Sequence, residues 1–305
     1  MPVYSRRRWE TPDGDFIDVD RVSGPADAPL VVLFHGLEGN SGSHYVRTLA
    51  ADVAQAGWRL AVPHFRGCSG EPNRLARVYH SGDSAEIAWM LGQFAAEAQS
   101  AALVAIGVSL GGNALLKYLG EAGQDARAVL RCAVAVSAPV DLAAAGNALA
   151  SGFNRLYARV FLATLKRKGA GKAARFPGLI DAAKVRAAST LREFDDAVTA
   201  PLHGFRDTDD YWRRASSKPW LAYVRVPTLL LNARNDPFLP QQALPGADEV
   251  ARCVELEFSD QGGHVGFTSG FFPGSFDWFG ERIMSFIRKH LAQGALPHSH
   301  DMKPG

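Results

Sequence analysis

Cysteine is scarce in this sequence, and neither a leader peptide nor a membrane span is visible. The three cysteines, Cys68, Cys132 and Cys253, are widely spaced and form no Cys-x-x-Cys pair, which argues against a disulfide framework and a zinc site. The three arginines at positions 6–8 are not followed by the apolar stretch of a signal peptide. No window approaches the roughly 18 apolar residues of a spanning helix. We therefore expect a soluble, cytoplasmic protein.

Charge of one sign is also lacking. The formal net charge is only +2 at pH 7, and no motif that reads RNA or DNA occurs, so nucleic acid is not expected as a partner. The chain of 305 residues is 47% hydrophobic, and a chain of this length buries a substantial core. Because α/β chains of this size often fold as one unit, we expect a single domain over residues 1–305.

Buried strands alternate with helices along most of the chain. Two short strands around a turn are expected in residues 3–22. Apolar runs with the composition of strands buried on both faces follow at 30–34, 58–62, 102–106, 132–136, 228–231 and 254–258. Helical patterns occur at about 44–56, 83–98, 110–122 and 276–292. This alternation predicts an α/β fold with a mostly parallel central sheet flanked by helices.

Residues 141–220 interrupt this alternation and contain no convincing strand. An all-helical insertion between two core strands is best interpreted as a cap over the active edge of the sheet. Only the last residues, 294–305, have the composition of a disordered tail.

A long helix is expected inside the cap over residues 147–168, followed by a glycine-containing loop at 168–172. One face of this helix carries Leu149, Phe153, Leu156 and Val160. Several apolar cap residues are candidates for lining an acyl pocket, although packing among the cap helices explains most of them equally well: Phe153, Leu156, Phe161, Phe205, Tyr211 and Trp212. The basic residues of 155–175 indicate a solvated face or, alternatively, attraction to phospholipid headgroups.

The segment Gly107-Val-Ser-Leu-Gly111 matches the pattern G-x-S-x-G. It directly follows the strand at 102–106 and directly precedes the helix at 110–122, which is the context that the motif requires. Small neighbours permit a sharp turn that exposes the serine, and the helix N-terminus beneath it favours developing negative charge. We therefore predict that Ser109 is a catalytic nucleophile.

A serine hydroxyl needs a base to remove its proton, and an acid must orient that base. With this type of elbow the order along the chain is serine, acid, histidine. Of the nine histidines, only His264 lies on a loop after the last predicted strand, between glycines. The others precede the serine or fall in the cap, the last helix or the tail: His35, His44, His64, His80, His203, His290, His298 and His300.

The predicted acid is Asp236, which follows the strand at 228–231 and precedes a proline that restricts its loop. Asp141, just after the strand at 132–136, is the alternative. Asp260 is too close in sequence to His264 to be the obvious partner. Asp236 is favoured, and Asp141 remains a competitor.

Stabilisation of a tetrahedral oxyanion requires two N–H donors. One is expected from the backbone of Leu110, immediately after the nucleophile. The other is expected from Leu37, in the glycine-containing loop 35–39 that follows the strand at 30–34. His35 is expected to hold this loop rather than to perform chemistry.

Four segments together resemble the YheT-like branch of the α/β-hydrolases: HGLEG at 35–39, FRGCSGEPN at 65–73, YHSG at 79–82 and GHVGF at 263–267. The resemblance covers almost the whole chain, including REFDD at 192–196 and HGF at 203–205. It implies esterase or lipase-like activity, with acyl transfer to alcohols in some eukaryotic relatives. The triad positions of the family carry over to Ser109, Asp236 and His264.

The expected protein is a serine carboxylesterase that hydrolyses short- to medium-chain acyl esters through an acyl-serine intermediate, with neither a metal nor an organic cofactor. Alternatives are an acyltransferase that passes the acyl group to an alcohol, and a lipase or phospholipase acting on lipid esters. A non-catalytic binding protein is a further rival. Dehalogenases and epoxide hydrolases need a carboxylate at the elbow, which Ser109 disfavours. The expected partners are a small-molecule or lipid ester and, transiently through the cap, a membrane surface.

Overall fold

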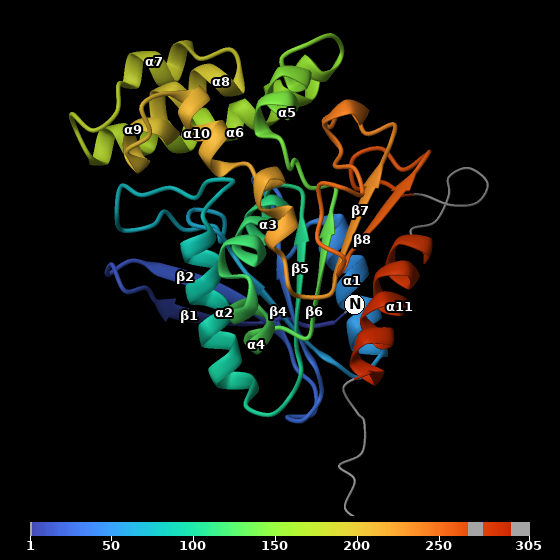
Figure 1. Cartoon of the computed structure of the whole chain (residues 1–305). Coiled ribbons are helices and arrows are strands. Elements are labelled where there is room, and N and C mark those ends of the chain that lie inside the picture. Colours follow the sequence, from blue (N-terminus) through green and yellow to red (C-terminus); the bar gives the residue numbers. More distant parts are fainter. Residues whose placement is uncertain (1, 268–276, 294–305) are drawn as a thin grey trace, which may run out of the picture.

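The structure, a computed structural model, describes residues 2–267 and 277–293 (Figure 1). Its centre is one eight-stranded sheet with the order β1-β2-β4-β3-β5-β6-β7-β8. The strands are β1 (Ser5–Glu10), β2 (Phe16–Val22), β3 (Leu30–Phe34), β4 (Arg59–Pro63), β5 (Leu103–Val108), β6 (Cys132–Val136), β7 (Thr228–Ala233) and β8 (Val254–Ser259). β2 runs antiparallel to both of its neighbours, and the strands from β4 to β8 are parallel. The predicted fold class is confirmed.

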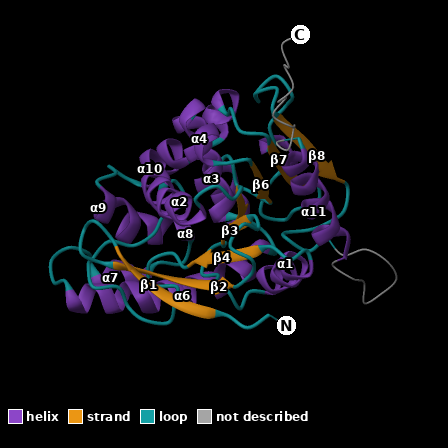
Figure 2. Ribbon diagram, turned by 90° about the horizontal axis from the view of Figure 1, so that it is seen from below, coloured by secondary structure: helices purple, strands orange, loops and turns teal. Residues whose placement is uncertain are grey.

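Helices cover both faces of the sheet (Figure 2). The helices of the core are α1 (His44–Gln55), α2 (Ser84–Ala98), α3 (Leu110–Ala122), α4 (Gln124–Val129) and α11 (Asp277–Ala292). Alternate side chains of β3 pack on opposite faces of the sheet. Val32 packs in the core that α2 and α3 share, whereas Val31 packs with α1 and α11. A strand that is buried on both sides reads as an unbroken apolar run, which explains the sequence pattern.

The segment between β6 and β7 folds as helices above the carboxyl ends of the parallel strands (Figure 1). It consists of α5 (Leu142–Leu149), α6 (Asn154–Arg175), α7 (Ala182–Ala187), α8 (Leu191–Phe194), the π-helical turn Asp195–Thr199, α9 (Ala200–His203), α10 (Thr208–Ala215) and the 3₁₀ turn Lys218–Tyr223. We call residues 142–215 the cap. It has its own small core, centred on Leu162, Val185, Phe194 and Val198. In the described part of the chain, no helix combines the length and apolarity needed to cross a membrane.

The cap differs from the sequence expectation in two places. The predicted loop at 168–172 is wrong, because α6 continues through it to Arg175. Gly169 and Ala173 lie on the buried face of α6, and a side chain at Gly169 would meet Val185 of α7 at 3.0 Å, so small residues here allow close helix packing. Residues 147–168 also form parts of two helices, which a break between α5 and α6 separates. The predicted tail at 294–305 lies outside the described residues.

Two helical glycines make a matched test of this packing. A Cβ atom on Gly120 of α3 would lie 2.4 Å from the backbone oxygen of Trp220, which a main chain cannot easily vacate, whereas one on Gly92 of α2 would meet nothing within 4 Å. We predict that Gly120→Ala lowers the free energy of unfolding by about 1–3 kcal/mol through overpacking. Gly92→Ala should raise it by roughly 0.5–1 kcal/mol, because the unfolded chain loses freedom. Urea denaturation of both variants measures the difference, and equal effects would contradict the packing.

Candidate active site

Ser109 occupies a sharp turn between β5 and α3. Its backbone has φ 52° and ψ −120°, a conformation that side chains rarely adopt, and its N–H donates to Val136 O at 2.8 Å. The turn leaves no room around it. A Cβ atom on Gly107 would lie 2.6 Å from Gly111 O, and one on Gly111 would lie 2.5 Å from Phe34 O. The glycines of the motif are therefore a steric requirement of the strained turn that presents the serine.

The structure brings Ser109, His264 and Asp236 together in one hydrogen-bonded chain, although its bonded neighbours are 155 and 28 positions apart in the sequence. His264 Nε2 lies 3.0 Å from Ser109 Oγ, and His264 Nδ1 lies 2.8 Å from Asp236 Oδ2. Because a carboxylate only accepts, the ring proton belongs on Nδ1, which leaves Nε2 to accept the proton of the serine hydroxyl. The geometry is that of a nucleophile, a base and an orienting acid.

Asp236 is held from several sides. It is almost fully buried, and its second oxygen, Oδ1, accepts from Phe238 N at 2.8 Å. The ring of Phe238 packs 4.3 Å from the ring of His264, centroid to centroid, which limits the movement of the imidazole. The loop of His264 is anchored on its other side by Val265 N, which donates to Ser137 Oγ at 3.3 Å.

The competing acids have other partners. Asp141 caps the N-terminus of α5, where its Oδ1 accepts from Ala144 N at 3.0 Å. Asp260 has a side chain that is 89% exposed and lies 3.5 Å from Arg234 Nε. In the structure, the carboxylate on His264 is that of Asp236.

The other histidines within the described residues lie apart from Ser109 Oγ. His35 and His64 are buried beside β4 and the loop that follows it. His80 and His203 pack against each other between core and cap, with ring centroids 4.4 Å apart, and burial lowers the pKa of His80 to about 3. His290 packs on Phe286 in α11. His44 begins α1, and His298 and His300 lie outside the described residues.

The loop 35–39 has three of its backbone N–H groups already engaged. Gly36 N donates to Tyr45 Oη at 2.8 Å, Glu38 N donates to Tyr79 Oη at 2.9 Å, and Gly39 N donates to Gly36 O at 3.0 Å. Leu37 N, between them, has no hydrogen-bond partner among the described residues. Leu110 N, the first N–H of α3, is likewise unpartnered there, as expected at a helix start. Both residues line the cavity that contains Ser109.

His35 connects this loop to the segment that follows β4. Its Nε2 accepts from Phe65 N at 3.1 Å, so its ring proton is on Nδ1, which donates to Gly36 O at 2.8 Å. Complete burial lowers the pKa of His35 to about 3, and the ring therefore stays neutral in this bridging role.

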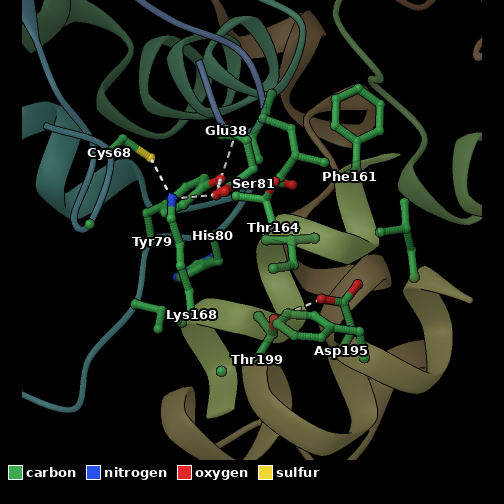
Figure 3. A pocket seen from close by; sticks show the side chains of 18 of the residues that line it. Glu38, Cys68, Tyr79, His80, Ser81, Phe161, Thr164, Lys168, Asp195 and Thr199 are labelled. Atoms are coloured by element: carbon green, nitrogen blue, oxygen red, sulfur yellow. Dashed lines mark hydrogen bonds and ion pairs between the residues drawn. The ribbon is translucent and has the colours of Figure 1, made fainter. Parts of the chain in front are cut away.

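A polar cluster joins the same loop to the cap (Figure 3). Tyr79 Oη donates to Glu38 Oε1 at 2.8 Å, and Lys168 Nζ of α6 lies 2.8 Å from the same oxygen. Lys168 Nζ is also 3.6 Å from Cys68 Sγ. The sequence reasoning missed the roles of Tyr45 and Lys168. Tyr79 belongs to the YHSG segment that the sequence singles out. Its hydrogen bonds with Glu38 join residues 41 positions apart, and no local sequence pattern indicates them.

The cavity between core and cap has a volume of about 610 Å³ and contains Ser109, Leu37, Leu110 and His264 on its wall. Its wall includes Phe161, Tyr211 and Trp212, three of the residues that the sequence offers as candidates for an acyl pocket. Phe153, Leu156 and Phe205, the other candidates for this role, are not on its wall.

Basic residues of α6 also line the cavity, together with acidic residues such as Glu38 and Glu71. Lys168, Lys172 and Arg175 project from α6 towards the loop after β4, where Lys172 contacts Leu75 O and Arg175 donates to Asn73 O at 2.8 Å. Lys172 and Arg175 thus contact neutral carbonyl oxygens and form no ion pair with another described residue. Within the described residues, no cluster of three or more histidine, cysteine or acidic side chains is arranged to hold a metal ion.

Comparison with known proteins places the chain in a family. The model of the alpha/beta hydrolase fold matches residues 29–271. The YheT protein of Escherichia coli (strain K12) is 40% identical over 290 residues, which cover 93% of this chain and 85% of that protein. Phospholipase ABHD3 of Homo sapiens is 30% identical over 311 residues, covering 98% of this chain and 74% of its own. Among solved structures, the Pyrococcus furiosus esterase Pf2001 has a TM-score of 0.59 at 18% identity, with 94% of this chain and 91% of that chain covered.

Pf2001 is too distant in sequence to show more than the fold, whereas the family model and YheT match most of this chain at the level of sequence. The chain is therefore a hydrolase of the α/β-hydrolase family and belongs to its YheT-like branch.

Proposed function

We propose that this hydrolase is a serine carboxylesterase, with Ser109 as nucleophile, His264 as general base and Asp236 as orienting acid. The single observation that carries the proposal is the continuous hydrogen-bonded chain from Ser109 Oγ through His264 to Asp236, on the wall of a cavity of about 610 Å³. Leu37 and Leu110, whose N–H groups have no partner among the described residues, line the same cavity, which supports the assignment of these two N–H groups as the oxyanion hole.

In the proposed mechanism, Ser109 Oγ attacks the ester carbonyl while His264 Nε2 takes the hydroxyl proton. The N–H groups of Leu37 and Leu110 stabilise the oxyanion, and Asp236 stabilises the imidazolium that forms. Collapse of the intermediate breaks the bond to the alcohol, which leaves with the proton from His264. Water then attacks the acyl-serine, transfers a proton to His264, and the acid is released as Ser109 regains its hydrogen.

The apolar and the basic side chains on the cavity wall support a substrate that has an apolar part and an anionic part. The apolar side chains are suited to a short- to medium-length acyl chain. Lys172 and Arg175, which form no ion pair with another described residue, favour a second candidate, a lipid ester whose alcohol part carries a phosphate. The name of the relative Phospholipase ABHD3 agrees with this candidate. Acyl transfer to an alcohol would use the same residues, and product analysis with added alcohol separates it from hydrolysis.

Loss of the nucleophile is the first test. We predict that Ser109→Ala lowers kcat for p-nitrophenyl esters by at least about a thousandfold, because no other group on the cavity wall replaces its hydroxyl beside His264. The variant should keep the melting temperature of the wild type within a few degrees and lose labelling by a fluorophosphonate. Full activity of Ser109→Ala would contradict the mechanism, and absence of labelling in the wild type would favour a non-catalytic protein.

The two candidate acids form a matched pair. We predict that Asp236→Asn lowers kcat by roughly ten-thousandfold, because an amide cannot hold His264 in the reactive tautomer or stabilise its charge. Asp141→Asn should change kcat less than about twofold, since asparagine caps a helix as well as aspartate does. Steady-state kinetics of both variants decide the assignment. The reverse pattern would make Asp141 the acid.

The support of the oxyanion loop gives a further test. Tyr45→Phe removes the acceptor of Gly36 N and leaves a buried N–H unpaired, which displaces the neighbouring Leu37 N–H. We predict a fall in kcat of about tenfold or more with little change in KM, because the loop acts on the transition state. The control is Tyr118→Phe, which removes the hydroxyl of another buried tyrosine that takes no part in this loop. A rise in KM at unchanged kcat for Tyr45→Phe would contradict the positioning role.

A further inference from the structure

Apolar side chains at the start of α6, together with that of Phe153, the residue that precedes the helix, form a row that faces outwards. Phe153, Leu156, Tyr157 and Val160 are 77%, 53%, 46% and 67% exposed. The spacing of i, i+3, i+4 and i+7 puts all four on one face of the helix. We call these four residues the α6 outer face. Single exposed apolar residues are ordinary, whereas a contiguous group of them marks an interaction surface.

The opposite face of the same helix is also apolar, but it is buried in the cap. It consists of small and aliphatic residues, namely Ala158, Leu162, Leu165, Gly169 and Ala173. A helix that is apolar on two opposite sides normally has a partner on each of them. Among the described residues, the cap covers only one of these sides.

The charged residues in the stretch that contains the outer face are all basic. No acidic residue occurs between Asp141 and Asp181. The same stretch contains seven cations: Arg155, Arg159, Lys166, Arg167, Lys168, Lys172 and Arg175. Arg155 and Arg159 are exposed on the same turns of α6, to one side of the apolar row, and neither forms an ion pair with another described residue. An apolar row bordered by arginines is complementary to a surface that is apolar inside and anionic outside.

The outer face continues into the wall of the candidate active site. The ring of Tyr157 lies 5.3 Å from that of Phe238, centroid to centroid, and Phe238 in turn packs on His264. Phe161, the residue after Val160, is on the cavity wall and also contacts Phe238. A hydrophobic molecule taken up at the outer face would therefore lie beside the cavity that contains Ser109.

We propose that the α6 outer face docks this enzyme on an anionic lipid surface, with the apolar side chains among the acyl chains and Arg155 and Arg159 at the headgroups. A second copy of the chain is a poorer occupant, because a twofold contact through this face would bring the unpaired arginines of both copies together. This proposal rests on the proposed esterase function in one respect: docking gives the enzyme access to ester substrates held in or near a lipid bilayer.

Vesicle flotation tests the docking with the full-length enzyme. The wild type should bind phosphatidylcholine vesicles that contain phosphatidylglycerol, bind pure phosphatidylcholine vesicles much more weakly, and dissociate from the former as salt is raised. The variants Phe153→Ser/Val160→Ser and Arg155→Gln/Arg159→Gln should each bind the anionic vesicles about tenfold more weakly, since they remove the apolar and the electrostatic contribution respectively. The control is Tyr223→Ser, which replaces an aromatic residue that is 56% exposed outside the cap and should bind as the wild type does.

Hydrolysis of a water-soluble short-chain ester separates this proposal from the proposed function. All three variants should keep wild-type activity there, because the altered residues are not on the cavity wall. A wild type that floats with anionic vesicles but hydrolyses no ester overturns the proposed function alone. Equal binding of neutral and anionic vesicles, or wild-type binding by both double variants, overturns the docking. A dimer in analytical ultracentrifugation that Phe153→Ser/Val160→Ser dissociates would also overturn it, by assigning the face to a second copy.

Discussion

Around Ser109 the main-chain segments approach one another so closely that only glycine fits between them. β5 ends where Gly107 faces Gly111, and Gly111 in turn faces the backbone of Phe34 at the end of β3. No side chain fits between these segments, so the turn has one geometry, which exposes the serine at the carboxyl edge of the sheet. The N-terminus of α3, the loop after β3 and the loops after β7 and β8 all meet at this edge. The strain of the turn persists because the strands around it, β3, β5 and β6, are fully buried.

The groups that complete the site are held from outside it. Tyr45 and Tyr79 use their hydroxyls to engage the N–H groups on either side of Leu37, and a neutral His35 supports the same loop. Lys168 then connects that loop to the cap through Glu38. This contact joins the cap to the loop that, in the proposed mechanism, supplies the Leu37 N–H to the oxyanion.

The sequence predicts the core far better than the cap. The β5–Ser109–α3 junction and the runs of β3 and β6 have local signatures, since burial on both faces requires apolar residues and the turn requires glycine. The end of α6 was misjudged because Gly169 normally indicates a loop, and only its packing against Val185 shows why a helix tolerates it. The exposure of Phe153 and Val160 was equally invisible, because periodicity shows that residues share a face but not what covers it. Contacts such as Glu38–Lys168 depend on tertiary proximity and leave no pattern in the sequence.

The proposed mechanism requires that the acyl group is transferred to Ser109 and then to water. The most direct measurement is an acid quench of the enzyme during turnover of a p-nitrophenyl ester, followed by mass spectrometry of its peptides. We predict a mass increase equal to one acyl group on the peptide that contains Ser109. Acylation of a different residue during turnover, or rapid turnover with no acylated peptide in a quench that traps known acyl-enzymes, would contradict it.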